Sequence, residues 1–257
     1  MPTECSGIPA RLAAVHDRVA DAARAADREP REVRVLLATK TQDAETVLAG
    51  VRAALERAAA AGDDRPVLIG ENRVQELVAK APALADLVGA GRVEAHLIGH
   101  LQKNKVNQVL SSATAVDSVD SLAIARALST RCERDGRTLD VLVQVNVSGE
   151  ESKSGVAPDD AAALAVDVAA LPGLRLSGFM TIGARLGEHR DEALVRAGFA
   201  RLREIRDGVL AGGAPGTADA RELSMGMTGD LELAVAEGAT VVRVGTAVFG
   251  ARPAPAR

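Results

Sequence analysis

Eight short runs of aliphatic and β-branched residues, spaced along the whole chain, constrain its fold more than any other feature. Some, such as Val35–Ala38 and Val141–Val143, are almost continuously apolar, which is typical of parallel strands covered on both faces. Stretches with apolar residues at helical spacing separate the runs. The predicted strands are Val33–Lys40, Pro66–Glu71, Val93–Gly99, Thr114–Val119, Leu139–Val147, Leu174–Thr181, Glu222–Met225 and Thr240–Phe249. Eight strands alternating with helices in 257 residues indicate an α/β fold, a closed (β/α)8 TIM-type barrel rather than an open sheet.

An additional helix is predicted before the first strand. Leu12 and Val19 share one face of it, and His16 of the same helix is expected at the surface. No break in composition marks a second domain. We therefore expect residues 1–252 to form a single barrel domain and residues 253–257 to form a mobile tail.

The charge and the aromatic content of the chain limit the kinds of partner that we expect it to bind. The 31 Lys and Arg residues against 35 Asp and Glu residues give a net charge of −4, and the chain has no Trp or Tyr and three Phe. A mildly acidic chain with almost no aromatic side chains is poorly suited to nucleic acid, which demands positive charge and stacking surfaces. No nucleic-acid partner is expected.

Cysteine usage and hydropathy bear on the compartment. Cys5 and Cys132 are too few for a disulfide framework or a structural zinc site, and Cys132 continues the apolar face of Ala125 and Leu128. Neither a signal peptide nor a membrane-spanning run is recognisable, and no spacing of His, Asp or Glu indicates a metal. The sequence predicts a cytoplasmic protein with no membrane partner and no metal.

Functional residues of such barrels gather where the strands end, and the first predicted strand ends in Lys40. A partly desolvated lysine favours the neutral amine, which attacks aldehydes to form a Schiff base. The alternative is a lysine whose charged head simply reaches solvent at the barrel mouth. From the position of Lys40 alone, both interpretations stay open.

The next two strands also end in polar groups. Asn72 follows the second predicted strand, and His96 lies near the end of the third. Either could contact a ligand at the barrel mouth. Asn72 could instead cap the following helix, and His96 could be a hydrogen-bonded core residue.

The last two strands carry the sharpest local signal. Ser224–Thr228 closes the seventh strand, and Arg243–Thr246 lies on the eighth. Gly226 and Gly245 would let backbone amides approach an anion, and Ser224 and Thr246 add hydroxyl donors. Phosphate sites of barrels are frequently built after strands seven and eight. The alternative, that the glycines serve only turns, leaves the two hydroxyl groups unexplained.

An amine at strand one opposite a phosphate site at strands seven and eight describes a pocket for a phosphorylated aldehyde. Pyridoxal 5′-phosphate fits this description. Arg243 could then face the pyridine nitrogen, which would weaken the electron sink that most pyridoxal enzymes strengthen with an acid at this place.

Seven sequence motifs occur in the order found in one known family: LLATKT (36–41), IGENRVQE (69–76), HLIGHLQKNK (96–105), VQVNVSGEESKSG (143–155), LSGFMTIG (176–183), LSMGMT (223–228) and VRVGTAVFGAR (242–252). With these motifs the chain resembles the pyridoxal phosphate homeostasis proteins, small proteins with a barrel of the alanine racemase N-terminal-domain type. The motifs cover nearly the whole chain. Arg73 is a departure, because many members have an aromatic residue there, and it changes the packing that the resemblance implies beside the cofactor.

The resemblance implies a barrel that holds pyridoxal 5′-phosphate on Lys40 as a Schiff base. Asn72 matches the family's cofactor-side asparagine, Arg243 its arginine near the ring nitrogen, and Ser224, Gly245 and Thr246 its phosphate-contacting motifs. The full set of expected cofactor-binding residues is Lys40, Asn72, His96, Ser224, Gly226, Arg243, Gly245 and Thr246.

Three functions share Lys40. The resemblance implies a non-catalytic carrier that binds, buffers or delivers pyridoxal 5′-phosphate, with related B6 vitamers as ligands and pyridoxal-phosphate-dependent apoenzymes as candidate partners. Racemases with this barrel use a tyrosine from an additional domain as one of two bases, and this chain has no tyrosine. A racemase-like enzyme and a cofactor-free Schiff-base aldolase are the alternatives. A monomer is the default expectation.

Overall fold

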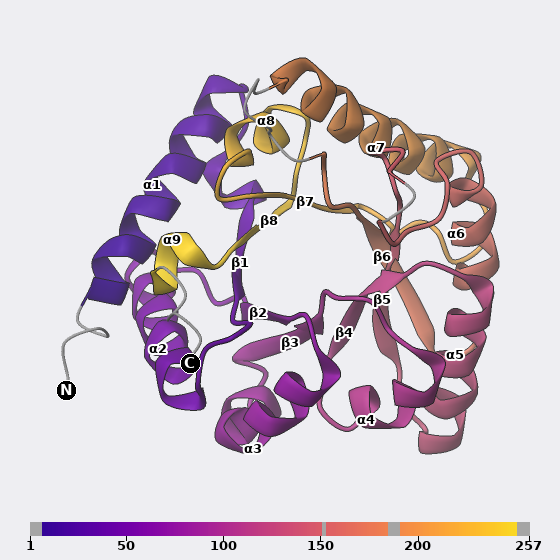
Figure 1. The fold of residues 1–257 in the computed structure, drawn as a ribbon, viewed down its shortest axis with the longest axis horizontal. Coiled ribbons are helices and arrows are strands. Elements are labelled where there is room, and N and C mark those ends of the chain that lie inside the picture. Colours follow the sequence, from indigo (N-terminus) through magenta and orange to yellow (C-terminus); the bar gives the residue numbers. More distant parts are fainter. Residues whose placement is uncertain (1–6, 151–152, 185–190, 251–257) are drawn as a thin grey trace, which may run out of the picture.

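The computed structural model of the chain describes residues 7–150, 153–184 and 191–250. Its eight parallel strands close into one barrel, seen end-on in Figure 1, in which each strand pairs with the next and β8 pairs with β1. The strands are β1 (Arg34–Ala38), β2 (Val67–Glu71), β3 (Val93–Leu97), β4 (Ala115–Val119), β5 (Leu139–Gln144), β6 (Leu174–Met180), β7 (Glu222–Met227) and β8 (Val241–Val244). The predicted (β/α)8 barrel is confirmed.

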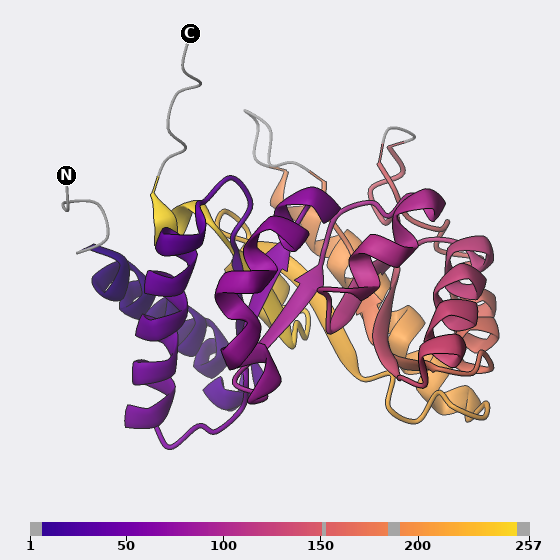
Figure 2. The same cartoon turned by 90° about the horizontal axis from the view of Figure 1, so that it is seen from below.

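Helices form a ring around the strands, visible end-on in Figure 1 and from the side in Figure 2. They are α1 (Ile8–Ala25), α2 (Ala44–Ala60), α3 (Val74–Gly89), α4 (Val106–Leu110), α5 (Leu122–Asp135), α6 (Ala161–Ala169), α7 (Glu192–Gly212), α8 (Leu231–Ala236) and α9 (Thr246–Phe249), with 3-10 turns at Pro30–Glu32 and Lys103–Lys105. The predicted additional helix is α1. It packs against α2, α8 and α9. Because α8 and α9 have only 6 and 4 residues, α1 helps to cover this part of the barrel. None of the described helices is both long and apolar enough to cross a membrane.

Apolar side chains fill two separate spaces. The larger lies between strands and helices, and Cys132 is fully buried within it, as predicted. The smaller lies inside the barrel and comprises Leu36, Ala38, Leu68, Ile98 and Val241. Successive strand residues point to opposite faces, so Leu36 and Ala38 face inward.

The last predicted strand was too long. β8 ends at Val244, and residues 246–249 form the short helix α9. The run of Thr, Val and Phe at its end has high β propensity, but the chain leaves the barrel at Gly245 and packs on α1. The predicted domain boundary at residue 252 and the tail 253–257 lie outside the described residues.

Candidate functional site

The carboxyl ends of four neighbouring strands gather most of the predicted site residues at one mouth of the barrel. In the closed sheet the order is β7, β8, β1, β2, and Arg243 of β8 pairs in register with Leu36 of β1. Lys40 follows β1, Asn72 follows β2, and Gly245 follows β8. The topology therefore brings Lys40, Arg243 and the predicted phosphate motifs to the same end.

Lys40 lies in the tight turn that leaves β1. Its side chain is half-buried. The next residue, Thr41, has φ of 67°, a left-handed conformation that is strained for a β-branched residue. The backbone at Lys40 therefore needs support from its surroundings.

That support comes from a buried ion pair that the sequence analysis missed. The Nζ atom of Lys80, from α3, lies 2.6 Å from Oε1 of Glu71 and donates to the carbonyl oxygen of Thr39 at 2.9 Å. The hydroxyl of Thr39 also donates to Oε1 of Glu71, at 2.6 Å. Burial raises the pKa of Glu71, while the hydrogen bonds from Lys80 and Thr39 act in the opposite direction.

Glu76, also from α3, completes this support. Its Oε2 atom accepts the backbone N–H of Thr41 at 2.8 Å and lies 3.7 Å from Nζ of Lys80. From the sequence, Glu76 and Lys80 look like ordinary polar residues of a helix. The signal that could have found Lys80 is its place among Leu77, Leu84 and other buried positions of α3.

Asn72 lies beside this network and is exposed. It does not cap the following helix, since α3 begins after Arg73 and has no side-chain cap. Gly99 packs against its backbone, where a Cβ atom at position 99 would lie 2.1 Å from the carbonyl oxygen of Asn72. The capping alternative for Asn72 is thereby removed.

Arg243 is buried at the centre of the site. Its guanidinium donates to Oγ of Ser224 at 2.9 Å and to the carbonyl oxygen of Thr181 at 2.6 Å. Burial lowers the pKa of Arg243, whereas the carboxylates of Asp117 and Asp230 favour its charged form. Ser224 is fully buried and accepts from the arginine, a contact that the sequence did not predict.

Neither glycine of the predicted phosphate motifs could carry a side chain without a shift of its neighbours. Gly226 has φ of 89°, and a Cβ atom there would lie 2.4 Å from Cβ of Ala234. At Gly245 a Cβ atom would lie 3.0 Å from the carbonyl oxygen of Ala38. Thr246 is exposed. The N–H of Met227 is already used, because it donates to Oδ1 of Asp230 at 2.6 Å.

His96 lies inside the barrel in a cluster of acids. Its Nδ1 atom is 2.8 Å from Oδ1 of Asp117, and its Nε2 atom is 3.6 Å from Oε2 of Glu94. Burial disfavours the charged ring, but Asp117 and Glu94 outweigh it and raise the pKa of His96 to about 10. The geometry matches the alternative of a hydrogen-bonded core histidine.

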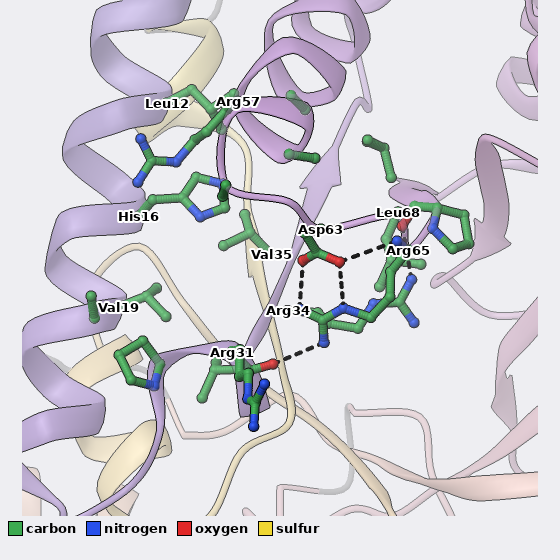
Figure 3. A pocket seen from close by; sticks show the side chains of 18 of the residues that line it. Leu12, His16, Val19, Arg31, Arg34, Val35, Arg57, Asp63, Arg65 and Leu68 are labelled. Atoms are coloured by element: carbon green, nitrogen blue, oxygen red, sulfur yellow. Dashed lines mark hydrogen bonds and ion pairs between the residues drawn. The ribbon is translucent and has the colours of Figure 1, made fainter.

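A cavity of about 760 Å³ lies elsewhere, between α1, α2 and the beginning of β1 and β2 (Figure 3). None of the predicted cofactor-binding residues lines it. The expectation that His16 is a surface residue was wrong, because it is half-buried in this wall. Burial, together with the nearby charge of Arg57, lowers the pKa of His16 to about 4. The cavity is therefore separate from the site at the barrel mouth.

Known proteins match the chain over nearly its whole length. The family model of the alanine racemase N-terminal domain matches residues 11–253. The pyridoxal phosphate homeostasis protein of Pseudomonas aeruginosa is 44% identical over 247 residues, 96% of each chain. A solved structure of an unknown protein from Bifidobacterium adolescentis has a TM-score of 0.86 with this chain, at 44% identity and covering 97% of both chains. PipY of Synechococcus elongatus, solved with PLP bound, has a TM-score of 0.71 at 34% identity and covers 95% of this chain and 100% of that chain.

Proposed function

The chain belongs to the pyridoxal phosphate homeostasis proteins, within the alanine racemase N-terminal-domain family, and we propose that it binds pyridoxal 5′-phosphate and buffers or delivers it. One observation carries the proposal. Lys40, at the end of β1, lies one strand away from the buried guanidinium of Arg243, at the mouth where the glycine-containing turns of β7 and β8 also end. An amine, a cation and a phosphate-compatible backbone are the three features that a phosphorylated aldehyde requires.

The residues at the mouth fit this cofactor. Arg243 uses two of its five N–H groups on Ser224 and Thr181, which leaves donors for an acceptor such as a ring nitrogen. Oε1 of the buried Gln144, the last residue of β5, has no hydrogen-bond partner in the described part of the chain. Gly245 lies so close to β1 that a Cβ atom there would come within 3.0 Å of the carbonyl oxygen of Ala38. The mouth thus offers polar groups that the described part of the chain leaves unused.

Each predicted residue has a distinct task in this proposal. Bound pyridoxal 5′-phosphate supplies an aldehyde that amines capture and a conjugated ring that absorbs visible light. Lys40 would hold the aldehyde carbon covalently, and Arg243 would donate to the ring nitrogen and keep a proton off it. Asn72 would contact the ring side of the cofactor.

The phosphate would lie against the turns after β7 and β8. Gly226 and Gly245 would admit the phosphate close to the backbone, and the hydroxyls of Ser224 and Thr246 would donate to it. His96 is the weakest member of the predicted set, because Asp117 and Glu94 already surround its ring. We assign it to the support of the barrel floor.

A carrier role is favoured over racemase chemistry by the same geometry. Two-base racemisation needs a second proton-transfer group on the opposite face of the substrate. The chain has no tyrosine, and His96 is buried against Asp117. The candidate recipients are pyridoxal-phosphate-dependent apoenzymes, and related B6 vitamers are the alternative ligands. The buried free thiol of Cys132 fits a reducing compartment, so we propose the cytoplasm.

Borohydride reduction and peptide mapping test the proposal. Protein incubated with pyridoxal 5′-phosphate and then freed of unbound ligand should retain a visible absorption band, which cannot come from any amino-acid side chain. After reduction the adduct should map to Lys40, and Lys40→Ala should abolish it. An adduct on Lys103, Lys105 or Lys153 in place of Lys40 would overturn the assignment, and fast racemisation of amino acids would overturn the carrier role.

A further inference from the structure

Both peptide groups that flank the Cα atom of Lys40 are held by side chains from α3. The carbonyl oxygen of Thr39, on the amino side, accepts from Nζ of Lys80 at 2.9 Å. The N–H of Thr41, on the carboxyl side, donates to Oε2 of Glu76 at 2.8 Å. The backbone that carries Lys40 is thus clamped from both sides by one helix.

The clamp holds a conformation that the chain would otherwise avoid. Thr41 has φ of 67°, a left-handed conformation that is strained for residues other than glycine. The hydrogen bond from its N–H to a carboxylate is of the stronger, charge-assisted kind. Without Glu76, Thr41 can relax to negative φ, and the direction in which Lys40 leaves the turn changes with it.

The charges of the clamp depend on one another. Lys80 is 8% exposed and Glu71 is 1% exposed, so neither is solvated by bulk water. Lys80 contacts Glu71 at 2.6 Å and Glu76 at 3.7 Å, which ties the end of β2 to α3. Glu71 directly precedes Asn72. Lys80 therefore connects Thr39 and Glu71, the residues that directly precede Lys40 and Asn72.

We propose that Glu76 and Lys80 are positioning residues for Lys40, fixing its two flanking peptide groups so that its amine is presented to an aldehyde at the barrel mouth. The amine's reactivity toward pyridoxal 5′-phosphate rests on the function proposed above, whereas the clamp itself does not. Covalent capture is sensitive to such placement, since a misplacement of about 1 Å can cost a hundredfold in rate.

The clamp is tested first without any ligand. Hydrogen exchange at the Thr41 amide should accelerate by about tenfold or more in Glu76→Ala, as expected for loss of a hydrogen bond to a charged group. Glu76→Gln keeps an acceptor and should restore most of the protection. Glu56→Ala is the matched control, because Glu56 of α2 is exposed and forms no hydrogen bond or ion pair within the described chain. Unchanged exchange in Glu76→Ala would overturn the clamp.

Positioning of the amine is tested by the rate at which Lys40 captures pyridoxal 5′-phosphate. Glu76→Ala and Lys80→Met should slow the growth of the visible band by about tenfold or more, while Glu76→Gln should stay within about threefold. Equilibrium binding should be measured in a Lys40→Ala background, where a positioning role predicts no change on adding Glu76→Ala. A parallel loss of binding in that background would overturn positioning in favour of a general disruption of the mouth.

Folding of the variants is controlled separately. Lys80→Met leaves the buried Glu71 without its cation, so the pair Glu71→Gln with Lys80→Met should be measured beside it. That double variant keeps an acceptor for Thr39 but removes the donor to its carbonyl oxygen, and it should also capture slowly. Capture at the wild-type rate in a folded double variant would overturn the role of Lys80. If wild-type protein captures no pyridoxal 5′-phosphate, the proposed function fails, and the exchange experiment still decides the clamp.

Discussion

The Oγ atom of Ser224 lies 2.9 Å from Nη1 of Arg243, and the hydroxyl accepts a hydrogen bond from a buried guanidinium on the neighbouring strand. The serine therefore has a structural contact in addition to the phosphate contact that we propose for it. It helps to hold the arginine in place, while its own O–H group stays available as a donor. In the proposed site, the cation assigned to the cofactor's ring and a hydroxyl assigned to its phosphate are linked by this hydrogen bond.

Ser224→Ala should consequently weaken both stability and cofactor retention. Removing the acceptor leaves a buried charged donor with one partner fewer, which costs about 1–3 kcal/mol in free energy of unfolding. Urea unfolding and equilibrium dialysis with pyridoxal 5′-phosphate measure the two effects. Ser129→Ala is the matched control, since Ser129 is buried and donates to the carbonyl oxygen of Pro172 at 2.7 Å outside the site. Equal retention in the two variants would contradict a role for Ser224 at the cofactor.

Thr246→Ala tests the other hydroxyl of the proposed phosphate site. Thr246 is exposed, so its replacement should change the free energy of unfolding by less than about 0.5 kcal/mol. Retention of pyridoxal 5′-phosphate should fall by about tenfold, equivalent to one hydrogen bond to a charged group. Pyridoxal, which lacks the phosphate, should bind Thr246→Ala and wild type equally. If both ligands lose affinity alike, the hydroxyl does not contact the phosphate.

Two substitutions of Thr41 should have opposite effects on the free energy of unfolding. Thr41→Pro cannot adopt φ of 67° and removes the N–H that binds Glu76, so it should destabilise the protein by about 3 kcal/mol or more. Thr41→Gly tolerates the left-handed backbone and keeps the N–H, so its stability should equal or exceed that of wild type by up to about 1 kcal/mol. Chemical unfolding of the two variants checks this. A well-tolerated proline would show that the turn does not require its observed conformation.

Sequence patterns predicted the barrel well because each strand carries its own signal. The aliphatic runs at Val35–Ala38 and Val141–Val143 are covered on both faces. Because both faces are buried, consecutive residues are apolar, and the strand can be recognised from the sequence. Lys40 and Asn72 could be placed together because the carboxyl ends of parallel strands meet at one mouth. Contacts between side chains of different helices and strands could not be predicted from the sequence. The pairing of Lys80 with Glu71, or of His96 with Asp117, depends on side-chain approach that no local spacing encodes.

The His96 cluster should make the free energy of unfolding depend on pH in the alkaline range. The pKa of His96 is raised to about 10, from 6.5 when unperturbed, so the folded state binds a proton more tightly than the unfolded state. Its contribution is complete below about pH 6.5 and is lost as the pH rises toward 10. The free energy of unfolding should fall over this window. In the double variant His96→Gln with Asp117→Asn the fall should be shallower, and parallel curves for both proteins would contradict a charged His96.

His16 should make the free energy of unfolding depend on pH in the acid range, because its pKa is lowered in the folded state and not raised. Burial and the charge of Arg57 lower its pKa to about 4, so between about pH 6.5 and 4 the unfolded state binds the extra proton. Stability should fall as the pH falls through this window. His16→Leu removes the titrating group and places an apolar side chain in a wall of the 760 Å³ cavity. Because the titrating group is gone, the free energy of unfolding should fall less steeply at acid pH. Arg57→Gln should reduce this fall less, because burial is the larger cause. An unchanged fall in His16→Leu would show that this histidine is not held neutral by the fold.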